Sequence, residues 1–259
     1  MFAKKWSKQT TALLEVGILF IPAIPAYIWI WPNISGAKQE IFQIISYIYV
    51  IAGTFFISLR RWRLDELGFN LKGFWVSLGA SVAILAGRLI IILSVNFGLE
   101  KPDFSPLETV GWIIYYFLLV GLGEEFLFRG LLYHALEGWR GTRWAIFGSS
   151  FGFLLWHIFG QGPVIGITTF FIGLAFAVIR WRSGSITWLI ILHALYDIET
   201  AFSISGSNQQ ILQAVRPDLP HPALTLVGFA LMVVTPFFLW LAYPSILAWV
   251  RTFKHAADS

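Results

Sequence analysis

The sequence predicts an all-α, polytopic membrane protein with eight transmembrane helices, on three observations: composition, the length of the apolar runs, and the charge of the loops. Of its 259 residues, 57% are hydrophobic and 12% are charged, and the mean hydropathy is +0.72. Soluble domains carry about 25% charged residues. Several apolar runs also reach the roughly 20 residues needed to cross a bilayer core about 30 Å thick.

Each expected helix is an apolar run bounded by proline, glycine or charged residues. In chain order, the first four are 11–31 before Pro32, 41–59 before Arg60, 74–97 before Gly98 and 110–137 before Gly138. The last four are 144–160 after Arg143, 164–180 after Pro163, 185–203 after Gly184 and 223–249 after Pro222. No long linker separates these runs, so we expect residues 1–259 to form a single integral membrane domain.

Successive loops alternate between many and few basic residues, so that one side of the predicted membrane domain carries most of them. One side carries Lys4, Lys5, Lys8, Arg60, Arg61, Arg63, Lys72, Arg129, Arg140, Arg143, Arg180, Arg182, Arg251 and Lys254, and the other carries Lys38, Lys101 and Arg216. Basic loops stay on the cytoplasmic side, so both termini are predicted to be cytoplasmic. This topology explains the net charge of +4 better than a nucleic-acid partner does. The absence of cysteine excludes disulfides and a cysteine nucleophile.

Ionisable side chains deep in a bilayer cost at least about 2.5 to 3.5 kcal/mol, so each calls for a partner or a function. The candidates are Glu15, Arg88, Glu124, Glu125, Arg129, His157, His193, Asp197 and Glu199. Glu125 and Arg129 are four residues apart on one helix face and can pair, whereas Glu124 points about 100° away. Glu124 is therefore left without a local counter-ion. His193 and Asp197 also share one helix face.

Three of these side chains are expected at a similar depth. Glu124, His157 and Asp197 each lie 13 or 14 residues from a predicted cytoplasmic helix end, which corresponds to about 20 Å at 1.5 Å per residue. His193 lies about one turn nearer the cytoplasmic end. We therefore expect polar groups from three helices to meet in one cavity.

The three patterns E-E-x-x-x-R (124–129), F-x-x-x-H (153–157) and H-x-x-x-D (193–197), in this order, resemble the CPBP family of intramembrane proteases, also called type II CAAX proteases or the Abi family. The resemblance covers about residues 105–200, which it identifies as a CAAX-protease-like catalytic core. It implies that Glu124 activates the attacking water, that His157 helps to position it, and that His193 and Asp197 stabilise the oxyanion. Glu125 and Arg129 would form a supporting pair.

Asp197 departs from the eukaryotic members of that family, which have Asn as an amide donor. An aspartate donates only when it is protonated, so Asp197 is neutral, orients His193, or ligates a metal. Two histidines and a carboxylate are also an ordinary zinc set, here Glu124, His157 and His193. The sequence leaves metal-free and zinc-assisted hydrolysis open, and no cofactor is certain.

Several residues have simpler structural interpretations. The buried charges could form an ion network, and the histidines could make interhelical hydrogen bonds. Residues 148–152 fit G-x-S-x-G, but a nucleophile elbow needs a strand-to-helix turn, so this pattern predicts close helix packing. Arg88 is expected to pair with Glu199 or Asp197, or else to bind a substrate carboxylate.

The expected function is an intramembrane endopeptidase that hydrolyses a peptide bond in a membrane-associated protein or peptide. The expected location is the inner membrane of a bacterium, with the lipid bilayer and the substrate as partners. Two alternatives from other classes are an ion-coupled transporter and a non-catalytic membrane scaffold or bacteriocin-immunity protein. A transporter would use Glu124, Arg88 and the histidines as a proton relay, although the inverted repeats common in transporters are absent.

Overall fold

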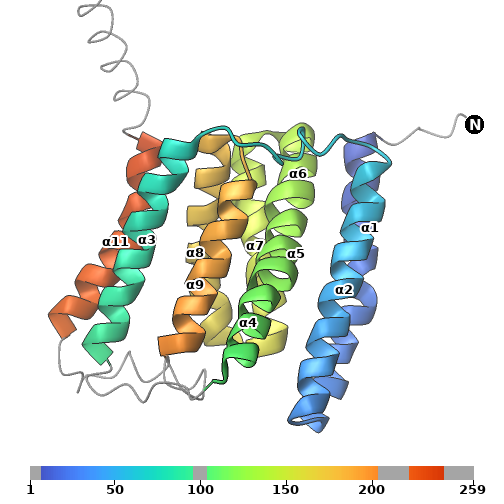
Figure 1. Cartoon of the computed structure of the whole chain (residues 1–259). Helices are drawn as coiled ribbons and strands as arrows, with labels where there is room; N and C mark the ends of the chain where they lie inside the picture. Colours follow the sequence, from blue (N-terminus) through green and yellow to red (C-terminus); the bar gives the residue numbers. More distant parts are fainter. Residues whose placement is uncertain (1–6, 96–103, 204–221, 242–259) are drawn as a thin grey trace, which may run out of the picture.

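The structure, a computed structural model, describes residues 7–95, 104–203 and 222–241. These residues are mainly helical and contain no strand, which confirms the all-α class. The helices run alternately up and down between two faces of the molecule (Figure 1). The ends of the expected spans 74–97 and 223–249 lie outside the described residues, as do the basic residues Lys4, Lys5, Lys101, Arg216, Arg251 and Lys254.

Each expected span falls on a helical segment. The N-terminal half contains α1 (Lys8–Pro25), which continues through η1 (Ala26–Ile30) and η2 (Trp31–Asn33), then α2 (Ala37–Leu59) and α3 (Phe74–Val95). A continuous run follows, made of α4 (Pro106–Ile114), η3 (Tyr115–Gly121), α5 (Leu122–Glu125), η4 (Phe126–Leu132) and α6 (Tyr133–Arg140). The last segments are α7 (Thr142–Gln161), α8 (Pro163–Ser183), α9 (Thr187–Ser203) and α11 (Pro222–Leu241).

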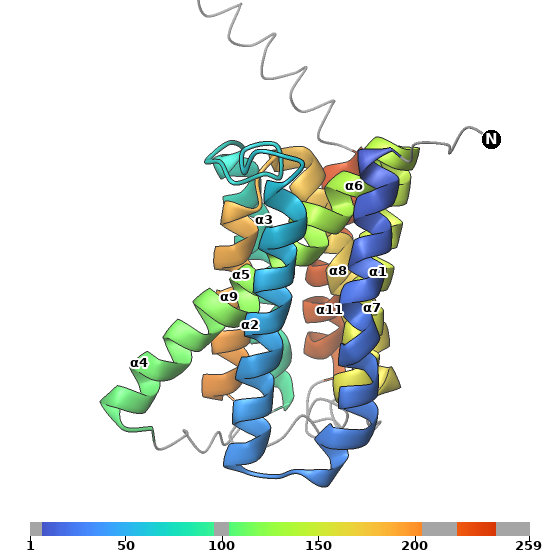
Figure 2. The ribbon, with the colours of Figure 1, turned by 90° about the vertical axis from the view of Figure 1, so that its right-hand side faces the viewer.

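Five of these segments are long and apolar enough to cross a membrane by length and composition. They are Lys8–Asn33, Ala37–Leu59, Phe74–Leu93, Pro106–Arg140 and Ile165–Ser183. The chain is therefore a multi-pass membrane protein, while the count of eight spans stays a prediction. Figure 2 shows that α4 is tilted away from the other helices.

The direction of the helices agrees with the alternation of loop charge. In both views α1 begins, α6 and α8 end, and the described part of α11 ends at the upper face, where the loop between α2 and α3 also lies (Figures 1 and 2). The basic residues of the loop at 60–73 and of the ends of α6 and α8 thus share one face. That this face is cytoplasmic remains a prediction from the charge rule.

Short glycine turns make the last helices of the site antiparallel neighbours. Gly141, Gly162 and Gly184 have φ values of 86°, 91° and 71°, a region that favours glycine. They join α6 to α7, α7 to α8, and α8 to the segment that leads into α9. These turns let helices that carry the glutamates and the two histidines pack against each other.

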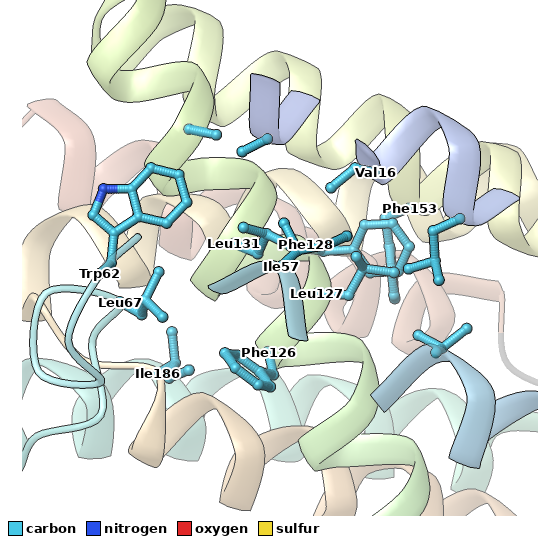
Figure 3. Packing of buried hydrophobic residues seen from close by; sticks show 14 residues of the cluster. Val16, Ile57, Trp62, Leu67, Phe126, Leu127, Phe128, Leu131, Phe153 and Ile186 are labelled. Carbon is cyan, nitrogen blue, oxygen red and sulfur yellow. The ribbon is translucent and has the colours of Figure 1, made fainter. Parts of the chain in front are cut away.

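The largest buried apolar cluster surrounds η4 (Figure 3). Phe126, Leu127, Phe128 and Leu131 of η4 are fully buried. They pack with buried residues of α1, α2 and α7, among them Val16, Ile57 and Phe153, and with Ile186, which directly precedes α9. Since the glutamates immediately precede η4, this packing fixes the helix that carries them.

The G-x-S-x-G pattern is used for close packing, as the sequence predicts. A Cβ atom on Gly148 would lie 2.7 Å from Leu136 Cδ1, and one on Gly152 would lie 2.9 Å from Leu132 Cδ2. Ser150 Oγ donates to the carbonyl oxygen of Ile146 at 2.7 Å. The segment lies within α7, so these contacts hold α7 against η4 and α6.

Two glycines face each other where α3 meets α11. A Cβ atom on Gly87 would lie 2.7 Å from the carbonyl oxygen of Gly228, and a Cβ on Gly228 would lie 2.5 Å from that of Gly87. Backbone atoms cannot move aside as a flexible side chain can. Small residues that allow such close approach are typical of helix contacts in membranes.

Replacing Gly87 by Val is therefore expected to destabilise the protein by about 1 to 3 kcal/mol, because the added carbons overpack this contact. Thermal unfolding in detergent micelles measures the change. Gly79→Val is the matched control, since Gly79 lies on the same helix and a Cβ there meets nothing within 4 Å. Equal losses in the two variants would contradict the assigned packing role of Gly87.

Candidate active site

The predicted site residues lie where α5 meets α7 and α9. Glu124 and Glu125 occupy the short helix α5, between the two π-helical segments η3 and η4. π-helical turns inside longer helices frequently occur at functional sites. The two glutamates are only 2% and 0% exposed, so each carboxylate depends on partners within the protein.

The two oxygens of Glu124 have different surroundings. Oε1 accepts hydrogen bonds from Tyr47 Oη at 2.6 Å and from Trp156 Nε1 at 3.1 Å. Among the described residues none donates a hydrogen bond to Oε2, which faces His157 Nε2 at 3.9 Å and His193 Nε2 at 3.7 Å. These separations are too long for direct hydrogen bonds and suit an intervening water.

His157 is oriented by its own helix. Its Nδ1 lies 2.9 Å from the carbonyl oxygen of Phe153, one turn earlier on α7. The Phe153 ring also packs edge to face against the imidazole, with ring centroids 4.4 Å apart. A carbonyl oxygen only accepts, so Nδ1 carries the proton in this contact and the Nε2 of a neutral ring is an acceptor. Nε2 is the atom that faces Glu124.

Glu125 connects Arg129 to His193. Its Oε1 accepts from Arg129 Nη1 at 3.0 Å and from His193 Nδ1 at 2.8 Å. Arg129 is fully buried, donates from Nη2 to the carbonyl oxygen of Gly173 at 3.3 Å, and lies over the Phe153 ring at 4.3 Å. The predicted Glu125–Arg129 pair is confirmed. The pair also sets the orientation of the His193 ring.

Asp197 is the most solvent-exposed of the four predicted catalytic residues. Its Oδ2 lies 3.5 Å from His193 Nε2, and its side chain is 24% exposed, compared with 3% for Glu124. Arg88 lies with its guanidinium over the ring of Tyr196, at 5.1 Å. The predicted pairing of Arg88 with Asp197 or Glu199 stays a prediction.

The structure thus brings Glu124, His157, His193 and Asp197 together from three helices, as the sequence predicts. Their functional roles remain predictions. Glu15, another predicted buried charge, lies elsewhere. It pairs with Arg60 at 2.9 Å and with Arg61 at 2.7 Å, between α1 and the end of α2.

Sequence reasoning missed two residues that contact Glu124, namely Tyr47 and Trp156. Tyr47 lies in the middle of the apolar helix α2, where its phenol has no neighbouring polar pattern. Trp156 directly precedes His157 in the C-terminal half of α7. A buried indole N–H usually has a hydrogen-bond partner. That rule was the one sequence signal that could have placed Trp156 in the site.

The predicted zinc ligands share one centre, since Glu124 Oε2 faces both imidazole Nε2 atoms. Within the described residues, however, no group of three or more His, Asp or Glu side chains is arranged to hold a metal ion. The donor types suit zinc. The zinc-assisted alternative therefore stays a prediction.

An apolar cleft reaches the back of the site. It has a volume of about 380 Å³ and is lined by residues of α1, η1, η4 and α7, including Phe20, Tyr27, Leu155 and Trp156. Trp156 thus lines the cleft and also donates a hydrogen bond from its indole Nε1 to Glu124.

Comparison with protein families gives a match over residues 106–198 to the family described as type II CAAX prenyl endopeptidase Rce1-like. The matched range contains Glu124, Glu125, Arg129, His157, His193 and Asp197. A comparison with curated proteins gives no match. Residues 106–198 of this multi-pass membrane protein therefore match the Rce1-like type II CAAX prenyl endopeptidase family, in agreement with the resemblance of the three sequence patterns.

Proposed function

We propose that the chain is an intramembrane endopeptidase in which Glu124 activates the water that attacks a peptide bond. The family match supports protease activity in general. The observation that carries the assignment to Glu124 is its buried Oε2, which lies 3.9 and 3.7 Å from two imidazole nitrogens. A general base must lie within reach of the proton that it removes, directly or through one water.

In the proposed first step, a water lies between Glu124 Oε2 and His157 Nε2. Both atoms are acceptors, so the water donates one hydrogen to each and keeps its lone pairs for the carbonyl carbon of the substrate. Glu124 takes a proton as the new C–O bond forms. The tetrahedral intermediate then breaks its C–N bond, and the proton on Glu124 passes to the leaving amine. The products are a carboxyl group and an amine.

His193 is proposed to stabilise the oxyanion of that intermediate. Its Nδ1–H is held by Glu125 at 2.8 Å, which leaves Nε2 directed at the site. In the imidazolium form Nε2–H donates to the oxyanion, while Glu125 and Asp197 balance the ring charge. Donors held in place before the reaction stabilise developing charge without reorganisation.

Asp197 is assigned to orient His193, because its Oδ2 lies 3.5 Å from His193 Nε2. Asp197→Asn keeps an acceptor for His193 and adds an amide donor for the oxyanion, so its activity should stay close to wild type. Asp197→Ala should lose about 10²- to 10³-fold in kcat, the usual effect of removing oxyanion stabilisation. The assay uses proteoliposomes and quenched fluorescent peptides with a lipid anchor.

The same variants distinguish the zinc-assisted version of the reaction, in which Glu124, His157 and His193 hold the metal. We expect purified wild-type protein to contain less than stoichiometric zinc and to keep its activity with a chelator. If Asp197→Asn is as inactive as Asp197→Ala and the wild type contains stoichiometric zinc, the metal-free mechanism is wrong.

The proposed substrate is a membrane-associated protein or peptide, because the site lies among apolar helices. The name of the matching family refers to a CAAX prenyl endopeptidase, so a prenylated peptide should be tested as a substrate together with acylated and transmembrane peptides. The proposed location is the inner membrane of a bacterium, with both termini in the cytoplasm. There the substrates would include membrane-anchored proteins and peptides that mature by cleavage.

A further inference from the structure

Tyr47 and Trp156 take no part in the chemistry proposed above, yet both donate to the same oxygen of Glu124. We infer that they are positioning residues, which anchor Glu124 Oε1 so that Oε2 remains directed at His157 and His193. This inference rests on the proposed role of Glu124 as the base. It adds two residues, from α2 and α7, that none of the three sequence patterns assigns to the reaction.

The first support is the geometry of the two hydrogen bonds. The donors lie at 2.6 Å (Tyr47 Oη) and 3.1 Å (Trp156 Nε1) from Oε1. A carboxylate oxygen has two lone pairs, so these two donors satisfy Oε1 and leave Oε2 for the water. Both oxygens belong to one rigid plane, and fixing one oxygen therefore fixes the other.

The second support is that the two donors are themselves held in place. The rings of Tyr47 and Trp156 pack edge to face with centroids 6.2 Å apart. Tyr115 packs on Tyr47 at 6.1 Å, while Phe20 and Tyr27 pack on Trp156 at 5.9 and 5.6 Å. Neither donor can easily turn away. Supporting residues locked by packing are what a precise catalytic geometry requires.

The third support is that the carboxylate of Glu124 would be free to rotate without these two donors. The last torsion of a glutamate side chain is broad and roughly two-fold, so an unanchored carboxylate would exchange its two oxygens. Among the described residues no Lys or Arg lies within salt-bridge distance of Glu124, and the two histidines face its Oε2, whereas the neighbouring Glu125 is held by Arg129 at 3.0 Å. The neutral donors of Tyr47 and Trp156 thus orient the carboxylate through Oε1 without adding a further positive charge, which would weaken Glu124 as a base.

Tyr47→Phe and Trp156→Phe remove each donor and keep an aromatic ring. Each should lower kcat by about 10- to 100-fold, in the range that misplacement of a reacting group causes. KM should change by less than about threefold, since neither group is proposed to bind substrate. The double variant should lose less than the product of the single losses, because both donors act on one carboxylate.

Two matched controls separate positioning from general packing. Tyr49 lies on the same helix, and its hydroxyl donates to the carbonyl oxygen of Leu19 at 3.2 Å. Trp188 Nε1 donates to the carbonyl oxygen of Lys72 at 3.1 Å, the same distance as in the Trp156 bond. Tyr49→Phe and Trp188→Phe should keep wild-type kcat. Equal losses in the controls, or wild-type kcat in both test variants, would overturn the inference.

A measurement without substrate tests the contact itself. In the NMR spectrum of micellar protein, Glu124→Ala should shift the indole N–H signal of Trp156, assigned with Trp156→Phe, and leave that of Trp188 unchanged. An unmoved Trp156 signal would overturn the inference. If Trp156 responds but the wild type cleaves no peptide, the proposed function fails and the contact stands. If Glu124→Gln abolishes cleavage while both Phe variants cleave normally, only the inference fails.

Discussion

Glu124→Gln is expected to lower kcat for peptide cleavage by about 10²- to 10⁴-fold, the contribution of a positioned general base. The substitution suits this test because the amide keeps an oxygen that can accept from Tyr47 and Trp156. The fold should therefore survive while the base is lost. Turnover of lipid-anchored peptides in proteoliposomes gives the rate, and thermal unfolding of the same preparation reports the fold.

Glu137→Gln is the matched control for this variant. Glu137 Oε1 also accepts from two side chains, Tyr133 at 3.3 Å and Thr142 at 3.0 Å, but it lies in α6, apart from the group that contains Glu124. Its replacement should leave kcat unchanged. A fully active Glu124→Gln protein would refute the assignment of the base. The transporter alternative gains support if that variant loses proton-coupled flux and no variant cleaves peptide.

Glu125→Gln is expected to reduce the free energy of unfolding by about 3 to 5 kcal/mol, because it leaves a buried cation without its counter-charge. Arg129 is fully buried, and its Nη1 lies 3.0 Å from Glu125. Typical stabilities are only about 5 to 15 kcal/mol, so the variant should show a low yield in membranes. Equilibrium unfolding in mixed micelles measures the change.

Two further variants show that the loss comes from the pair. Glu125→Gln combined with Arg129→Met removes both charges and should be less destabilised than the sum of the single variants. Asp65→Asn tests the solvent-exposed pair of Arg63 and Asp65, whose side chains are 82% and 58% exposed. Surface pairs often contribute nothing measurable. Strict additivity in the double variant would contradict the proposed coupling of Glu125 and Arg129.

The part of the site that could be predicted from sequence follows from helix periodicity. A spacing of four residues puts Glu125 beside Arg129 and His193 beside Asp197, and both contacts are present, at 3.0 and 3.5 Å. Counting residues from the helix ends put Glu124 and His157 at one depth, and their atoms lie 3.9 Å apart. Such arguments succeed because an α-helix has a fixed rise and turn.

The contacts that could not be predicted depend on which helices become neighbours. Tyr47 lies 77 residues before Glu124, on a mainly apolar helix whose sequence does not indicate a contact with α5. Its bond exists because α2 packs against α5. His193 was expected to stabilise the oxyanion or to ligate zinc, whereas its contact with Glu125 through Nδ1 was not expected. No spacing within a single helix indicates a contact of this kind.

The local helix geometry around the glutamates was also not predictable. A uniform period of 3.6 residues was assumed for the whole segment 110–137, whereas π-helical turns occupy Tyr115–Gly121 and Phe126–Leu132. Wider turns depend on the neighbours that fill the space around them, here the buried cluster that contains Phe126 and Phe128. The hydrophobic pattern of the sequence does not distinguish the two kinds of turn.

Single-turnover cleavage in water labelled with heavy oxygen tests the central claim most directly. Wild-type protein in excess over a cleavable lipid-anchored peptide is quenched after one turnover, and mass spectrometry locates the label. If Glu124 activates a water, the new carboxyl end of the product carries one labelled oxygen and the side chain of Glu124 carries none. Label in Glu124, or an unlabelled first product, would show a covalent acyl-glutamate and contradict the proposed mechanism.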